Sequence, residues 1–366
     1  MKVEFIDLKK RYIEEKSEIL KCIKTVLSKG SFVLTKEVEN FEKLICNYTG
    51  SKYCIGVNSG TDGLMMSLWA MGIKKGDEII TSPISFIASA SSIIHLGAKP
   101  IFVDVDNDLN INPDLIRQKI TKKTKAIMPV HWTGRICNMK KILSIAKKAN
   151  IDVLEDAAQA MGSYYMKKHA GTFGKVSAFS THPLKNLNSV GDGGFIITDN
   201  KRIHDKIKLY RNHGLKGRDN VEIIGVNSRL DSLHAEILSF RLKRLKSIIS
   251  RRQKNIDLYR KYIETDKVRI IDDEQFQNNS YVMFITLCEN RDQLQKYLKK
   301  YDIQSLIYYG TPLHLHKATK FLGYKKGDFP NAEKFTKQVL SFPFHQHLKE
   351  KEIKFVCQKI NDFYKK

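Results

Sequence analysis

The sequence of 366 residues contains no apolar run of transmembrane length, and its mean hydropathy is −0.35. The first residues, Met1 to Phe5, lack the apolar stretch of a secretory signal peptide. These absences predict a soluble protein of the cytoplasm that has no membrane partner. With 42% hydrophobic residues, the chain can still form a large core, and its length predicts two domains.

Cysteine is scarce and never paired as Cys-x-x-Cys. No cluster of Cys and His has the spacing of metal ligands, so we expect no zinc site and no other metal. In a reducing cytosol these residues are expected to be buried or free thiols. The six cysteines are Cys22, Cys46, Cys54, Cys137, Cys288 and Cys357.

Acidic residues are few: 39 Asp and Glu oppose 63 Lys and Arg, which gives a net charge of +24. Such a charge raises the possibility of a regulatory or nucleic-acid-binding protein. However, the basic residues are scattered, with modest clusters at Lys122-Lys123, at Lys140-Lys141 and from Arg241 to Arg252, and no nucleic-acid-binding motif accompanies them. The pattern favours no nucleic-acid partner and a positive surface that attracts an anionic substrate.

The chain has no internal repeat and no low-complexity segment, and its first half alternates short apolar runs with helical patterns. Amphipathic stretches such as Asp62–Met71 and Met139–Ala149 lie between the strand candidates. This alternation predicts an α/β domain with a mostly parallel sheet. The strand candidates are Tyr53–Val57, Glu78–Thr81, Pro100–Val103, Ala126–Val130, Val153–Glu155, Val176–Ser180 and Gly194–Thr198.

The segment Leu230–Ile263 has no Pro or Gly and carries apolar residues at helical spacing, which predicts one long helix or two. We expect a large domain over residues 1–245, with the N-terminal segment, and a smaller α+β domain over residues 246–366. The elements expected in the second domain are a strand (Tyr281–Leu287), a helix (Asp292–Lys300), an irregular stretch (Tyr308–Gly323) and a final helix (Glu350–Tyr364).

Polar side chains follow the predicted strands, where ligands of open α/β sheets bind. After Val57, Gly60 permits close backbone approach and Thr61 adds a hydroxyl at a helix start, which together could hold a phosphate. A simple helix cap is the alternative for this segment alone. Phe86, beyond the next strand, could stack on a flat ring or belong to the core.

Two acidic residues, Glu155 and Asp156, end an apolar strand, where a carboxylate is costly to bury without a partner. A carboxylate facing a pyridine nitrogen would keep that nitrogen protonated and make the ring an electron sink. For Glu155 we favour a helix cap or a local salt bridge. Lys185 follows another strand beside Pro183 and a Gly-rich turn, and burial there would lower its pKa and make it a nucleophile. For this residue alone, a solvated lysine is the favoured alternative.

The order and spacing of these segments resemble the DegT/DnrJ/StrS family of sugar aminotransferases along nearly the whole chain. Its specific segments here are Asp156-Ala157-Ala158-Gln159 and His182-Pro183-Leu184-Lys185-Asn186-Leu187. Further matching segments are Phe5-Ile6-Asp7-Leu8, Phe41-Glu42, Asn58-Ser59-Gly60-Thr61, Gly97-Ala98-Lys99-Pro100, Val130-His131, Phe179-Ser180, Gly225-Val226-Asn227-Ser228-Arg229 and Leu340-Ser341-Phe342-Pro343.

The resemblance implies the type I (aspartate aminotransferase-like) fold, a homodimer with shared active sites, pyridoxal 5′-phosphate (PLP) and L-glutamate as amino donor. It implies that Lys185 holds PLP as a Schiff base and moves the proton, and that Asp156 pairs with the pyridinium nitrogen. The remaining implied cofactor contacts are Gln159 near the ring hydroxyl, Phe86 on the ring, Gly60, Thr61 and Ser180 at the phosphate, and Asn227 at the phosphate from the partner subunit.

The acceptor that the resemblance implies is a nucleotide-linked keto-sugar. The sequence Gly191-Asp192-Gly193-Gly194 is similar to members that aminate 3-keto sugars such as dTDP-3-keto-6-deoxyhexoses. Amination at C4 of a UDP- or GDP-linked sugar is the alternative. Tyr308, Tyr309 and His314 fall in a loop that resembles the family's sugar-contacting region. Related dehydratases replace the lysine with histidine, so the presence of Lys185 argues against dehydration.

Overall fold

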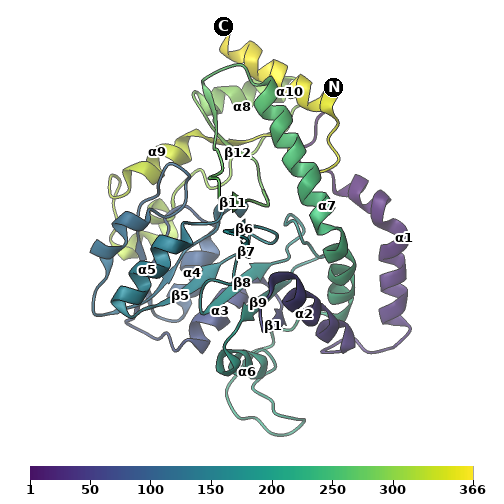
Figure 1. Ribbon diagram of the computed structural model, residues 1–366, viewed down its shortest axis with the longest axis vertical. Helices are drawn as coiled ribbons and strands as arrows, with labels where there is room; N and C mark the ends of the chain where they lie inside the picture. Colours follow the sequence, from purple (N-terminus) through teal and green to yellow (C-terminus); the bar gives the residue numbers. More distant parts are fainter. Residues whose placement is uncertain (366) are drawn as a thin grey trace.

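The computed structural model describes residues 1–365, in which seven strands form one sheet in the order β1-β9-β8-β5-β4-β2-β3 (Figure 1). All strands of this sheet point the same way except β9, which is antiparallel to both of its neighbours. The prediction of a mostly parallel α/β sheet is confirmed. The strands are β1 Tyr53–Val57, β2 Glu78–Thr81, β3 Lys99–Phe102, β4 Thr124–Met128, β5 Asp152–Asp156, β8 Val176–Ser180 and β9 Gly194–Thr198.

Helices cover both faces of this sheet and enclose two apolar cores. Because neighbouring strand residues point to opposite faces, Val153 of β5 enters one core and Leu154 the other. The elements around the sheet are α1 Leu8–Leu27, α2 Lys36–Thr49, α3 Gly60–Ala70, α4 Ile87–His95, η1 Pro113–Leu115, η2 Arg117–Lys119, η3 Trp132–Gly134, α5 Met139–Ala149 and α6 Lys201–Tyr210.

The C-terminal part forms a second, three-stranded sheet with a core of its own. Its elements are β10 Val268–Ile270, β12 Ile285–Cys288, α8 Arg291–Lys300, η4 Leu313–Leu315, η5 Lys317–Leu322, α9 Pro330–Gln338, β13 Val339–Ser341 and α10 Glu350–Tyr364. A third small sheet contains β6 Tyr164–Tyr165, β7 Lys168–His169 and β11 Gln277–Asn278.

The long helix α7 (Ser232–Tyr262) connects the two parts and runs along one side of the molecule in Figure 1. Its Leu245 and Ile249 pack in the core of the large sheet, whereas Ile256 and Tyr259 pack in the C-terminal core. The expected boundary between residues 245 and 246 therefore falls inside a helix that belongs to both cores.

The strand predicted over Tyr281–Leu287 begins only at Ile285, so the first half of that prediction is wrong. Tyr281 has a positive φ of 47°, and the Val282 N–H donates to the carbonyl of Thr133 rather than to a strand. An apolar run alone does not reveal that its backbone turns away to meet another segment.

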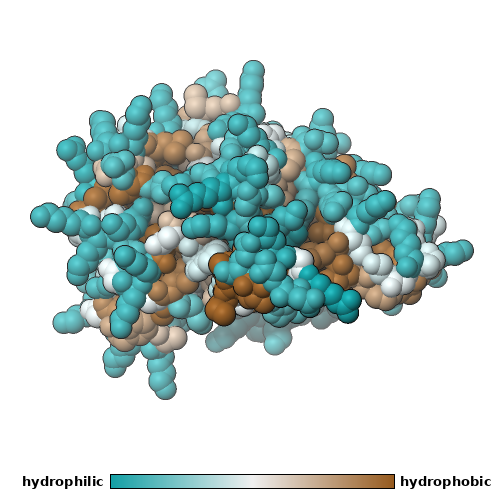
Figure 2. Space-filling view, turned by 90° about the horizontal axis from the view of Figure 1, so that it is seen from below, coloured by the Kyte–Doolittle hydropathy of each residue, from teal (hydrophilic) through white to brown (hydrophobic). Residues whose placement is uncertain are grey.

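Figure 2 shows the face near α6, on which polar side chains surround separate apolar patches. Among the exposed apolar side chains are Val221 and Ile224, which belong to the loop after α6. None of the helices in residues 1–365 combines the length and apolarity needed to cross a bilayer. The same residues contain no group of three or more His, Cys, Asp or Glu side chains arranged to hold a metal ion.

Candidate active site

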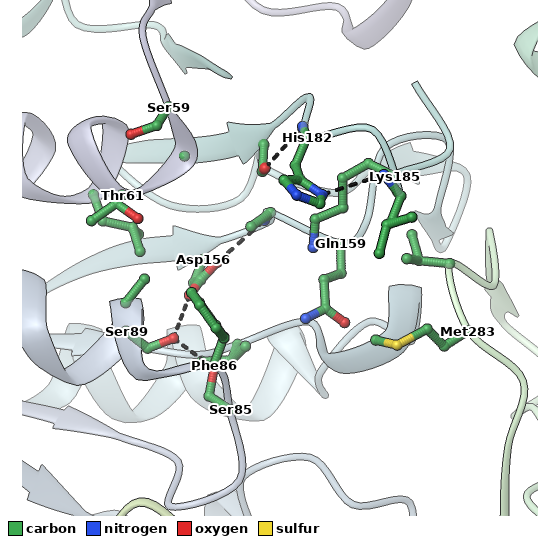
Figure 3. Close-up of a pocket in the computed structure, with 18 of the residues that line it drawn as sticks. Ser59, Thr61, Ser85, Phe86, Ser89, Asp156, Gln159, His182, Lys185 and Met283 are labelled. Atoms are coloured by element: carbon green, nitrogen blue, oxygen red, sulfur yellow. Dashed lines mark hydrogen bonds between the residues drawn. The ribbon is translucent and has the colours of Figure 1, made fainter. Parts of the chain in front are cut away.

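A cavity of about 430 Å³ opens where the parallel strands end, within the size range of small-molecule sites. Its walls come from the segments that follow β1, β2, β5 and β8, and Val282 and Tyr308 close it from the C-terminal part. Figure 3 shows that Lys185, Asp156, Gln159 and Thr61 approach one another from these separate elements. The polar residues that follow these strands in the sequence therefore line one cavity.

Lys185 follows β8 in a short turn, in which its backbone N–H donates to the carbonyl of His182 at 2.8 Å. Its half-buried side chain faces the cavity. Burial lowers the pKa of the Lys185 amine to about 8, although the nearby Asp156 acts in the opposite direction. A substantial fraction of this amine is therefore neutral near pH 8 and able to attack a carbonyl carbon.

Asp156 ends β5 and is 4% exposed. Its Oδ2 accepts a hydrogen bond from Ser89 Oγ at 2.6 Å, and Ser85 shares a 2.6 Å hydrogen bond with Ser89 (Figure 3). Burial raises the pKa of Asp156, and the hydrogen bonds from Ser89 and Ala158 and the charge of Lys185 only partly offset this. The carboxylate is thus held in place but lacks a close cation, as expected for a group whose positive partner is a ligand.

The start of α3 forms the opposite end of the cavity. Ser59 caps this helix by accepting a hydrogen bond from the Asp62 N–H at 3.0 Å. A Cβ atom on Gly60 would lie 2.8 Å from Cβ of Ser180, so glycine lets α3 approach the end of β8 this closely. Free N–H groups of the first turn, with the hydroxyls of Thr61 and Ser180, make a suitable phosphate cradle.

Gln159 is oriented by two hydrogen bonds. Its Oε1 accepts from the Thr133 N–H at 2.8 Å, which leaves Nε2 to donate to the Tyr309 hydroxyl at 3.1 Å. Phe86 is 55% exposed within the cavity wall, and its ring centroid lies 6.4 Å from that of Tyr309. An exposed ring at this place offers a surface for a flat ligand.

Two predicted site residues lie away from the cavity in residues 1–365. Asn227 is exposed and pairs by a backbone bridge with Asn212 on the loop after α6. His314 is 2% exposed, and its Nε2 lies 3.1 Å from Glu333 inside the C-terminal part. The other predicted residues, Tyr308 and Tyr309 included, all line the cavity.

Glu155 has the local partners that its position in the sequence suggested. Its carboxylate lies 2.9 Å from His131 Nε2 and accepts hydrogen bonds from the N–H groups of Gly171, Phe173 and Gly174. Because Glu155 points away from the cavity and is fully satisfied, the expectation of a local salt bridge is confirmed.

The sequence argument missed Ser89, which holds Asp156, and Ile6, which lines the cavity from the N-terminal segment. Ser85, Ser89 and Ser92 recur at spacings of four and three residues. Such a polar stripe on an otherwise apolar helix next to a predicted site is a signal that could have found Ser89.

The residues present fit a phosphate-bearing pyridine aldehyde. The phosphate cradle, the lysine and a buried carboxylate are the three groups that such a cofactor needs, and all face one cavity. The fold and this set of groups define a type I PLP-dependent enzyme.

Residues 13–361 match the DegT/DnrJ/EryC1/StrS aminotransferase family, and the chain belongs to it. It is 38% identical to the "Pleiotropic regulatory protein" of Geobacillus stearothermophilus (100% of this chain, 99% of the relative). It is 36% identical to a dTDP-3-amino-3,6-dideoxy-alpha-D-galactopyranose transaminase of Aneurinibacillus thermoaerophilus (99% of each chain). The crystal structure of S. venezuelae DesV in complex with a ketimine intermediate matches with a TM-score of 0.97 at 33% identity (100% of this chain, 99% of that chain). The chain is therefore a PLP-dependent sugar aminotransferase.

Proposed function

We propose that the enzyme moves an amino group from L-glutamate to a nucleotide-linked 3-keto-6-deoxyhexose, with dTDP as the nucleotide. The observation that carries the proposal is that Lys185, whose pKa is lowered, and the buried carboxylate of Asp156 face the same cavity. The 3-amino sugar in the name of the 36%-identical relative supports amination at C3.

PLP, when bound, supplies an electron sink for the carbon that loses or gains the amino group. Asp156 stabilises positive charge on the pyridine nitrogen, while Ser89 and the Ala158 N–H keep the carboxylate oriented. Gly60, Thr61 and Ser180 bind the phosphate. Phe86 and Gln159 line the same cavity, where Phe86 would stack on the ring and Gln159 would contact its hydroxyl.

Lys185 Nζ carries out the proton transfers. It takes a proton from the carbon of the amino donor and returns one to the carbon of the acceptor. A pKa of about 8 suits both directions, because a group titrating near the working pH accepts and releases protons readily. Tyr308 lines the cavity from the C-terminal part, which supports the proposal that it contacts the sugar.

The substrate is tested by mass spectrometry of the products formed from glutamate and a panel of nucleotide keto-sugars. The panel contains dTDP-3-keto-6-deoxyhexoses and UDP- and GDP-4-keto sugars. Amine formation on the 3-keto compounds is the expected result. Amination of the 4-keto sugars alone would establish the C4 alternative. No amine from any member would refute the proposed substrate class.

The active unit is proposed to be a cytoplasmic homodimer in which Asn227 reaches the phosphate of the neighbouring site. Asn227 is exposed and lies outside the cavity of its own chain, and apolar side chains of the same loop, Val221 and Ile224, are also exposed. Mixed Lys185→Ala and Asn227→Ala chains should regain activity after subunit exchange, because one hybrid site then carries both residues. No recovery after verified exchange would indicate that each subunit builds its own site.

A further inference from the structure

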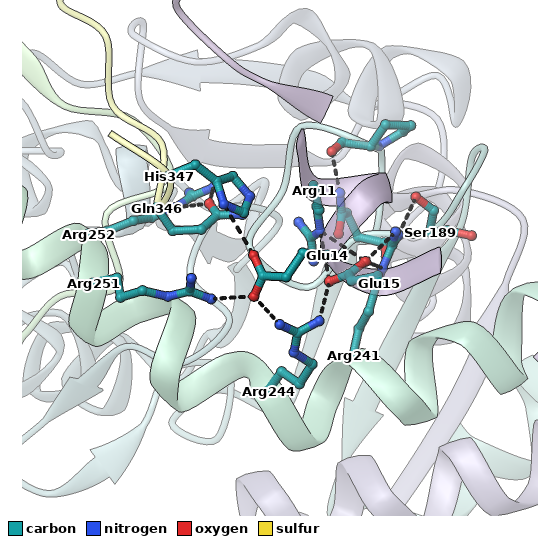
Figure 4. A network of polar contacts seen from close by, with 12 residues as sticks. Arg11, Glu14, Glu15, Ser189, Arg241, Arg244, Arg251, Arg252, Gln346 and His347 are labelled. Carbon is teal, nitrogen blue, oxygen red and sulfur yellow. Dashed lines mark hydrogen bonds and ion pairs between the residues drawn. The ribbon is translucent and has the colours of Figure 1, made fainter. Parts of the chain in front are cut away.

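The face of the Lys185 loop that points away from the cavity contacts a network of arginines, shown in Figure 4. Four of them, Arg241, Arg244, Arg251 and Arg252, come from α7. The network also contains Glu14 and Glu15 of α1 and Gln346 and His347 near the C-terminus. This arrangement places several guanidinium groups behind the loop that carries the reactive lysine.

Three of these arginines have carboxylate partners. Arg241 binds Glu15 with N–O distances of 2.8 and 2.9 Å, and Arg244 and Arg251 both contact Glu14. Ordinary ion pairing explains their presence in the fold. Arg241 also donates to the backbone carbonyls of Asn188 and Ser189 in the loop after Lys185, but it has Glu15 as a counterion.

Arg252 differs because it forms no ion pair with any carboxylate in the described chain, although it is only 6% exposed. Burial, together with the positive charge of Arg11, lowers its pKa to about 9. Burying a charge without a counterion costs stability, and a well-packed apolar side chain is often at least as stable in such a place. Ion pairing therefore does not explain this arginine, whose guanidinium also lies 5.9 Å from the ring centroid of Phe344.

All acceptors of Arg252 are neutral and lie on three segments around the site. Its Nη1 donates to Asn186 Oδ1 and approaches the carbonyls of Tyr281 and Val282 at 3.4 and 3.5 Å. Its Nε and Nη2 both donate to Gln346 Oε1, at 3.3 and 3.2 Å. The planar guanidinium thus fixes the relative positions of these segments.

Asn186 is the direct link to the lysine, since it is the next residue in the chain and is 1% exposed. Its Nδ2 donates to the carbonyl of Ser280 at 2.8 Å, so both ends of its amide are held. Val282, whose carbonyl Arg252 approaches, is itself part of the cavity wall. Moving Arg252 would therefore disturb the start of the lysine side chain and the wall that faces it.

We propose that Arg252 is a positioning residue, which holds Lys185 through Asn186 and sets the facing cavity wall through Val282. This rests on the proposed role of Lys185. Arg252→Met roughly keeps the length of the side chain but removes the guanidinium group. Asn186→Ala removes the side-chain amide that connects Arg252 to the backbone next to Lys185. Arg251→Met is the matched control, because this neighbour on the same helix faces Glu14 instead.

Three quantities are compared between the variants. They are kcat per bound cofactor, KM for glutamate, and the pH at which the visible absorbance change of the holoenzyme is half complete. Arg252→Met should lower kcat by roughly 10- to 100-fold, the scale expected when a reacting group is misplaced by about 1 Å, with a smaller change in KM. The pH midpoint should shift in the same variant. Arg251→Met should stay within about two-fold of the wild type, since exposed ion pairs contribute little.

A double variant distinguishes a single positioning unit from general damage. If Arg252 acts through Asn186, Arg252→Met/Asn186→Ala should be no slower than the worse single variant, because coupled effects are not additive. A lower melting temperature with wild-type kcat and pH midpoint would overturn the inference, as would multiplicative losses. If Arg252→Met does not fold, Asn186→Ala alone decides, because Arg252 keeps its other acceptors.

Failure of this inference is distinguishable from failure of the proposed function. Borohydride reduction followed by peptide mapping shows which lysine carries the cofactor. A label on another lysine would refute the role of Lys185 itself. A label on Lys185 combined with unchanged kinetics and spectrum in Arg252→Met and Asn186→Ala would refute only the role of Arg252.

Discussion

Glu155 and Asp156 are adjacent, acidic and buried at the end of the same strand, but their side chains have different environments. Glu155 contacts His131 and three backbone N–H groups, whereas Asp156 lines the cavity. Burial would raise the pKa of Glu155, but His131 and the N–H groups of Gly174 and Gly171 hold it below its ordinary value. Burial raises the pKa of Asp156, and no such set of partners reverses the shift. The comparison teaches that a buried carboxylate with many donors supports the fold, whereas one that has fewer donors and faces a cavity is suited to bind a ligand.

The sharpest test of this difference is Asp156→Ala. The variant should fold and bind some cofactor but transaminate at least about 10²-fold more slowly, because one preorganised charge beside the developing charge is lost. The measurement is kcat per bound cofactor. Near-normal turnover would show that the pyridine nitrogen lies elsewhere.

Glu155→Gln should have the converse effect, a loss of stability with a smaller effect on chemistry. Glutamine cannot accept all the hydrogen bonds that the carboxylate receives from the N–H groups of Gly171, Phe173 and Gly174, and a buried group left unsatisfied costs roughly 1–3 kcal/mol, which denaturant unfolding of the purified protein measures. Because the pKa of Glu155 is lower in the folded state, its contribution is present at neutral pH. That contribution disappears as the pH falls through the folded-state pKa. An unchanged unfolding midpoint would contradict this assignment.

The pH dependence of cofactor attachment separates Lys185 from ordinary lysines. Its neutral amine is the nucleophile, and its pKa is about 8 rather than the model-peptide value of 10.5. The rate at which cofactor-free protein takes up PLP should rise about tenfold per pH unit below pH 8 and level off above it. A rate that still rises steeply beyond pH 9 would mean that the amine is not perturbed.

The smallest expected effect belongs to the C-terminal wall of the cavity. Tyr309→Phe removes the acceptor for Gln159 Nε2 and keeps the ring beside Phe86. One neutral hydrogen bond is worth about 1 kcal/mol, so kcat/KM should fall by roughly fivefold. His314→Gln serves as the control, because His314 lies outside the cavity. A larger loss in the control would show that activity depends on the folding of the segment 308–323 rather than on the Tyr309 hydroxyl.

Strand ends and residue chemistry made Lys185 and Asp156 candidates, whereas Gln159 and Ser180 were named only from the family resemblance. Lys185 and Asp156 each follow a buried strand, and the carboxyl ends of neighbouring parallel strands meet at one edge. Ser89 could not be paired with Asp156 from the sequence, because 67 residues separate them and only the sheet brings them together. Arg252 was missed, although its spacing from Ile249 and Ile256 places it on the apolar face of α7 and could have indicated its burial.

The central claim is that Lys185 holds the cofactor, and borohydride reduction of the holoenzyme tests it directly. The purified protein should be yellow, and reduction should fix the cofactor's mass on the peptide that contains Lys185. Lys185→Ala should give no labelled peptide after the same treatment. A label on any other lysine, or an equally labelled Lys185→Ala protein, would contradict the account.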